Sequence, residues 1–175
     1  MIRMGSDAVV ASTGYRDKNY NHRMYYTTTR DFKSFSDTRL RYDQGLNVID
    51  ATIKPDGDRY VMFLKNETRW PPGKNIRIAY GRYLTGPYGK ASGPITGEYW
   101  AEGPTALKLE DRWIVYSDKY RKGEMGAVSS PDLKKWKDIS GQVSFTEEMR
   151  HGTVFKVSGT EFERLKQPLE SEAGE

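Results

Sequence analysis

Two acids and one histidine recur at nearly even spacing in this sequence, and together they could transfer protons. Asp50, Glu102 and His151 lie 52 and 49 residues apart. Taken singly, each has an ordinary structural explanation, as a turn aspartate, a loop glutamate before Gly-Pro and a hydrogen-bonded histidine. If they converge in one partly desolvated cavity, crowding is expected to raise the pKa of at least one acid. A general acid needs such a pKa at neutral pH.

An internal repeat of about 50 residues would bring these three positions together. The run DRYVMF at 58–63 returns as DRWIVY at 111–116, and a turn around Asp31 returns around Asp132. Short β-rich runs separated by turn residues fill each period, without an amphipathic helix. This pattern predicts an all-β propeller, in which equivalent inner-strand residues point at one central axis. An irregular β-sandwich is the alternative.

The repeat accounts for about two full blades plus parts of two others. Full units span 48–97 and 100–147, residues 9–45 supply strands two to four of an earlier blade, and 151–157 supply one inner strand. A closed ring needs roughly four or more blades, so further strands are expected on the N-terminal side. Unpaired blade edges would favour self-association.

The last residues form a separate tail in this scheme. We expect a partial propeller domain over 1–160 and a C-terminal tail over 161–175. Thr160 followed three residues later by Glu163 has the pattern of a capped helix start. A short helix from Thr160 to about Leu169 is therefore predicted.

Composition excludes several other classes of function. The 175 residues are 36% hydrophobic and 13% aromatic, which is too apolar for a disordered chain. The net charge of +4 is spread among alternating acids and bases, so no nucleic-acid partner is expected. There is no cysteine, no visible secretion signal and no apolar run of membrane length. No membrane partner is expected either.

The segments around the three residues resemble glycoside hydrolase family 43. The resemblance rests on NVIDATI at 47–53, YWAEGPT at 99–105, RHGTV at 150–154 and the stretch from 21 to 32. It implies a five-bladed β-propeller that hydrolyses O-glycosidic bonds with inversion. By the same resemblance, Glu102 is the general acid, Asp50 tunes its pKa and positions it, and His151 supports the site at the axis.

One family residue has no counterpart in this chain. The general-base aspartate of the family lies two blades before the tuning aspartate, which by the repeat length falls before Met1. Neither Asp7 nor Asp17 lies at an expected inner-strand start. The chain therefore resembles a C-terminal fragment that is inactive alone because its general base is missing. No organic cofactor is implied, and a structural metal ion near the axis is left open.

The parent enzyme is expected to act outside the cell or in the periplasm, on arabinofuranosyl or xylosyl linkages of plant-type polysaccharides or oligosaccharides. A non-catalytic carbohydrate-binding propeller is one alternative. A related propeller enzyme, either a fructosidase or a glycoside phosphorylase with basic residues directed at phosphate, is another. Loops on the active face should contact the sugar, with these candidate residues: Trp70, Trp100, Tyr15, Tyr20, Lys65, Asp118 and Tyr120.

Overall fold

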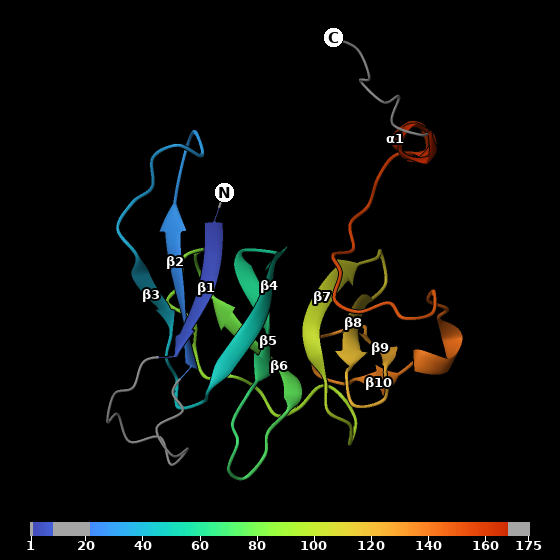
Figure 1. Ribbon diagram of the computed structural model, residues 1–175, viewed down its shortest axis with the longest axis horizontal. Helices are drawn as coiled ribbons and strands as arrows, with labels where there is room; N and C mark the ends of the chain where they lie inside the picture. Colours follow the sequence, from blue (N-terminus) through green and yellow to red (C-terminus); the bar gives the residue numbers. More distant parts are fainter. Residues whose placement is uncertain (1, 9–21, 168–175) are drawn as a thin grey trace.

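The computed structural model describes residues 2–8 and 22–167, and its regular structure is almost entirely β-strand (Figure 1). The described strands form three antiparallel sheets. The first sheet consists of β1 (Ile2–Ala8), β2 (His22–Thr28) and β3 (Arg39–Tyr42). The second consists of β4 (Val48–Asp56), β5 (Arg59–Asn66) and β6 (Asn75–Gly81). The third consists of β7 (Glu102–Lys108), β8 (Trp113–Lys119), β9 (Glu124–Ser130) and β10 (Lys137–Asp138).

The second and third sheets are two copies of one blade. β4, β5 and β6 pair in sequence order, and β7, β8 and β9 pair in the same way. In the second sheet the expected fourth strand is an irregular segment. There the N–H groups of Gly89 and Ser92 donate to the carbonyls of Tyr80 and Ile78, on β6. The repeat unit of the sequence therefore corresponds to one antiparallel blade.

The turn between the third and fourth strands of a blade repeats in atomic detail. The carboxylate of Asp31 accepts hydrogen bonds from the N–H groups two and three residues later, at 2.9 Å, and Asp132 does the same. Phe32 and Leu133 both have left-handed backbones, with φ of 58° and 60°. The backbone donors lower the pKa of Asp31 to about 2. β1 and β2 are therefore the second and third strands of their blade, although β1 begins earlier than the predicted residue 9.

The second sheet is packed between the other two. Val61 and Phe63 of β5 belong to a core shared with the third sheet, whereas Met62 and Leu64 belong to a core shared with the first. Alternate strand residues point to opposite faces, so β5 is buried on both. Removing each of these side chains from water contributes roughly 1.5–3 kcal/mol. Face-to-face stacking of successive sheets is the arrangement of propeller blades.

Two tryptophans fill the space between the second and third sheets. The ring of Trp113 lies 5.8 Å from that of Phe63, and the ring of Trp136 lies 6.4 Å from it at a right angle. Both distances suit favourable aromatic pairs. Both tryptophans therefore pack between adjacent blades.

The predicted inner strand at 151–157 is not formed as a strand. A strand needs backbone pairing, and the described residues supply no paired strand for this segment. Instead the N–H of Val154 donates to Oγ1 of Thr105 at 3.0 Å, which holds the extended segment against β7. A related link joins the previous pair of blades, where Oγ1 of Thr52 donates to the carbonyl of Pro104 at 2.6 Å.

The predicted C-terminal helix is present but begins earlier than expected. Helix α1 spans Gly159–Lys166 and lies away from the sheets, with none of its residues buried (Figure 1). Its N-cap is Ser158, not Thr160, because Ser158 and Glu161 form a reciprocal capping box. A 3-10 turn at Ser140–Gln142 precedes it. Among the described residues, no helix has the length and apolar character needed to cross a membrane.

Candidate active site

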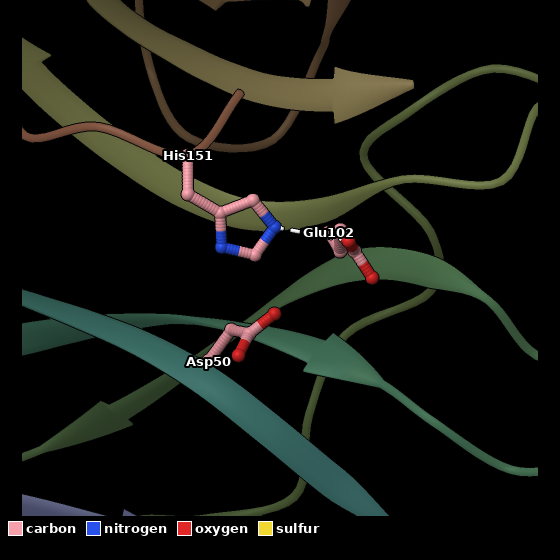
Figure 2. Close-up of side chains that lie close together, drawn as sticks. All are labelled: Asp50, Glu102 and His151. Atoms are coloured by element: carbon pink, nitrogen blue, oxygen red, sulfur yellow. Dashed lines mark hydrogen bonds and ion pairs between the residues drawn. The ribbon is translucent and has the colours of Figure 1, made fainter. Parts of the chain in front are cut away.

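Asp50, Glu102 and His151 meet at one point, as the repeat predicts. Figure 2 shows the three side chains directed toward one another, and their nearest ligand atoms all lie within 4.8 Å of each other. Asp50 lies near the start of β4, and Glu102 begins β7. His151 begins the segment 151–157, which follows the third sheet in the sequence. The predicted convergence of these residues is confirmed, and their roles in catalysis stay predictions.

Asp50 lies at a β-bulge that directs its side chain into the site. The register between β4 and β5 shifts between Ile49 and Ala51, and Asp50 has a φ of 46°. Bulges commonly redirect a side chain beside an active site, and aspartate tolerates this backbone region better than most residues. The carboxylate accepts a hydrogen bond from the N–H of Gly103 at 3.0 Å. Asp50 thus holds the peptide next to Glu102.

Both carboxylate oxygens of Glu102 have partners. Oε2 accepts from Nζ of Lys65 at 2.8 Å, whereas Oε1 lies 3.0 Å from Nε2 of His151 and 3.6 Å from Nη2 of Arg150. Burial by itself raises the pKa of Glu102, but hydrogen bonds from Lys65 and His151 outweigh it and the pKa lies below its usual value. The prediction that crowding raises an acid's pKa is wrong for Glu102, because cations accompany the acids.

Gly103 keeps open the space that His151 occupies. Its φ is 56°, and a Cβ atom at this position would lie 2.8 Å from Cγ and Nδ1 of the His151 ring. A side chain here would therefore meet both a strained backbone and an aromatic ring. The glycine next to Glu102 is a requirement of the site and not only of a turn.

Replacing Gly103 by alanine should break the Glu102–His151 hydrogen bond and lower the free energy of unfolding by about 1–2 kcal/mol. Urea unfolding measures the second effect, and ¹⁵N chemical shifts of the His151 imidazole report the first. Gly57→Ala is the matched control, because Gly57 has a φ of 64° with no atom within 4 Å of its Cβ position. Gly57→Ala should show only the loss of unfolding free energy that comes from the strained backbone, with no change in the His151 shifts. Unchanged imidazole shifts in Gly103→Ala would contradict this account.

Asp118 lies inside strand β8, where the sequence predicted a loop residue. It is completely buried, and its Oδ2 accepts a hydrogen bond from Nε of Arg150 and lies 3.8 Å from Nε2 of His151. Its Oδ1 has no hydrogen-bond partner among the described residues. A buried carboxylate is costly unless a cation accompanies it. The observed contacts of Asp118 are thus with the basic residues that flank Glu102.

Arg150 is a site residue that sequence reasoning missed. Its side chain is 55% exposed and links Asp118 to Glu102. The hydrogen bond to Asp118 raises the pKa of Arg150 above its usual value. Its position next to His151 was the available signal. The sequence could not show which carboxylates an arginine at that position would reach, because both come from the preceding blade.

Three more of the predicted substrate-binding residues join this cluster or border it. Lys65 ends up inside β5, with only 3% of its side chain exposed, and its Nζ lies 4.6 Å from the centre of the Tyr120 ring. The rings of Tyr120 and Trp100 are 6.0 Å apart, and the guanidinium of Arg121 lies 4.1 Å from the centre of the Trp100 ring. An aromatic and cationic wall thus extends from Glu102 toward solvent.

The remaining predicted contacts are not brought into the cluster. Trp70 is 69% exposed and lies in the connection between β5 and β6, apart from the contacts described above. Tyr15 and Tyr20 fall outside the described residues. For these three residues, contact with sugar stays a prediction.

Asp50, Glu102 and His151 offer donor atoms both for proton transfer and for a cation. Their donor atoms lie close enough to share a cation. However, Lys65 and His151 already occupy both oxygens of Glu102, and Asp50 accepts from a backbone N–H. Carboxylates and an imidazole joined by hydrogen bonds can exchange protons with a bound substrate.

Two solved structures share this fold at low sequence identity. One comes from work on the GH130 family of mannoside phosphorylases, which contains glycoside hydrolases that target β-1,2 mannosidic linkages in Candida mannan. It has a TM-score of 0.55 and 16% identity, covering 78% of this chain and 44% of that chain. The other, a glycosyl hydrolase from Bacteroides ovatus, has a TM-score of 0.52 and 17% identity, covering 79% and 44%. The chain has a partial fold of this propeller type.

Sequence comparison points to the same class. An α-L-arabinofuranosidase of Bifidobacterium longum subsp. longum is 30% identical over 149 residues, which cover 67% of this chain and 14% of the relative. The chain thus spans a small part of the length of that enzyme. The model of a family described as a probable glycosyl hydrolase domain, related to glycoside hydrolase family 43, matches residues 6–163. The chain belongs to this family of glycosyl hydrolase domains related to glycoside hydrolase family 43.

Proposed function

We propose that the complete protein hydrolyses O-glycosidic bonds of arabinofuranosyl or xylosyl units in plant-type polysaccharides or oligosaccharides. The observation that carries the proposal is the convergence of Asp50, Glu102 and His151 in a chain of this family. The similarity to an α-L-arabinofuranosidase supports the sugar class. A mannosidic substrate has only a likeness of fold behind it.

In this proposal Glu102 donates a proton to the leaving oxygen as the bond between that oxygen and the anomeric carbon breaks. A water molecule attacks the anomeric carbon from the opposite face and gives its proton to a second carboxylate. For inversion, this base lies roughly 6.5–9.5 Å from the acid. Asp50 positions Glu102 through the N–H of Gly103, and His151 fixes the rotamer of Glu102 through Oε1.

Proton donation requires a pKa for Glu102 higher than the one found in this chain. A neighbouring anion raises the pKa of an acid, and so does removal of water. The base carboxylate and a bound sugar would supply both effects in the complete protein. Without them Glu102 is ionised at neutral pH, since its pKa lies below the usual value.

Sugar contacts are assigned to the aromatic wall. Trp100 and Tyr120 offer ring faces near Glu102, and such faces suit the C–H faces of sugar rings. Trp70, like Tyr15 and Tyr20, would contact a sugar unit of the polysaccharide that lies farther from the cleaved bond. Asp118 would act by holding Arg150 beside the substrate.

Two other functions make different demands on the same cluster. A carbohydrate-binding propeller would use the aromatic wall and have no need of a paired acid. A phosphorylase would use phosphate in place of water, and the exposed guanidinium of Arg150 beside Glu102 is the observation that favours it.

Assay of the complete protein in phosphate-free buffer separates the three. Aryl α-L-arabinofuranosides and β-D-xylosides should be cleaved there, with oligosaccharide binding measured in parallel by calorimetry. Binding without cleavage would indicate a carbohydrate-binding module. Cleavage only after phosphate is added would indicate a phosphorylase.

A further inference from the structure

Lys65 is a buried cation shared by two carboxylates from different parts of the fold. Its Nζ lies 2.8 Å from Oε2 of Glu102, on β7, and 2.7 Å from Oε2 of Glu67, just after β5. The face of Tyr120 covers the ammonium. An ammonium with 3% exposure is stable only if such partners offset its lost hydration. This enclosure leaves little room for Lys65 to bind a sugar directly.

A second buried lysine balances the other carboxylate. Lys74 donates to Oε1 and to the carbonyl oxygen of Glu67. Lys65, Lys74, Glu67 and Glu102 therefore form a connected group of two cations and two anions. The group is neutral only while Glu102 is ionised, and protonation of Glu102 would leave an excess positive charge in a largely buried place.

The other groups facing Glu102 do not replace Lys65. Arg150 lies near Oε1, but its charge is matched by Asp118. His151 also contacts Oε1, and Asp50 is the nearby anion, with its carboxylate on the N–H of Gly103. Lys65 is thus the charged group that contacts Oε2 of Glu102. Since Lys74 also pairs with Glu67, the charge of Lys65 is balanced largely by Glu102.

We propose that Lys65 is a positioning residue that holds Glu102 in its ionised form and in a fixed rotamer. It would stabilise the carboxylate of Glu102 that remains after proton donation. It would also oppose reprotonation of Glu102 until the base carboxylate or a bound sugar raises the pKa of Glu102. The proposal rests on the proposed function only in taking Glu102 as the acid. The ion pair also joins two adjacent blades, because Lys65 belongs to the second sheet and Glu102 to the third.

The test is an NMR titration of the 175-residue chain carrying ¹³C-labelled glutamate, with the Glu102 signal assigned by its loss in Glu102→Gln. Lys65→Met should raise the pKa of Glu102 by about 1–3 pH units, because an opposite charge at this distance typically lowers a carboxyl pKa by that amount. Glu67→Gln should lower it, because Lys65 then has Glu102 as its main partner. Lys65→Arg should keep the pKa near that of the unmodified chain.

Lys119→Met is the matched control. Lys119 is also a buried strand-end lysine, but it pairs with Glu124 and the ring of Tyr99. Its loss should leave the pKa of Glu102 unchanged, so a shift there would mark general loosening and overturn the assignment. A pKa unchanged in Lys65→Met, or raised in Glu67→Gln, would also overturn it. If Lys65→Met does not fold, the sign of the Glu67→Gln shift decides. No substrate is used, so failure of the proposed reaction leaves the result interpretable.

Discussion

Glu102→Gln in the complete protein should lower turnover by about 10²- to 10⁴-fold on glycosides with poor leaving groups. Glutamine keeps the shape of the side chain and can still accept from Lys65 or His151, but it has no proton to give. Aryl glycosides with acidic leaving groups need little protonation, so their turnover should fall far less. The measurement is kcat/KM for both substrate types with each variant.

Glu124→Gln provides the control for this substitution. Glu124 is exposed and pairs with Lys119, so the same chemical change there should leave both rates unaltered. An equal loss on both substrate types in Glu102→Gln would remove Glu102 from the acid role. It would point to a role in binding or folding that both substrates share.

The 175-residue chain alone should release no measurable sugar from aryl arabinofuranosides or xylosides. Among the described residues at inner-strand starts, Asp50 and His151 place ligand atoms within 4.8 Å of Glu102. This is closer than the roughly 6.5–9.5 Å between acid and base that inversion requires. General-base assistance is worth about 10² to 10⁴ in rate. Release of the aryl group is followed by fluorescence.

Addition of a polypeptide that supplies the blades expected on the N-terminal side should restore turnover to this chain. Light scattering on the same samples establishes whether the chain is a monomer. Cleavage of these substrates by a monodisperse monomer alone would contradict the assignment, because the base would then belong to this chain.

The repeat made the site predictable in outline. Equivalent residues of successive blades approach one axis, so offsets of 52 and 49 were enough to bring Asp50, Glu102 and His151 together. Burial of β5 on both faces likewise follows from its continuous apolar run, Val61 to Leu64, between turns.

Contacts between blades could not be predicted in this way. The burial of Lys65 against Glu102 depends on how the second sheet packs on the third, and this packing leaves no mark in the order of residues. The same holds for the link from Arg150 to Asp118. The direction of the Glu102 pKa was missed for this reason, since spacing located the acids and not their cations.

Local errors had local causes. Thr160 and Ser158 both stand three residues before a glutamate, so two capping patterns compete, and the structure uses the earlier one. The segment 151–157 has the composition of a strand, but a strand also needs a neighbour with which to pair.

The configuration of the first sugar product tests the central claim most directly. In the complete protein, acid donation by Glu102 with direct attack of water predicts a free sugar whose anomeric configuration is inverted, formed at the same rate with or without phosphate. ¹H NMR of the reaction in its first minutes resolves the two anomers before they equilibrate. A retained configuration, or a sugar phosphate formed only when phosphate is present, would contradict the account.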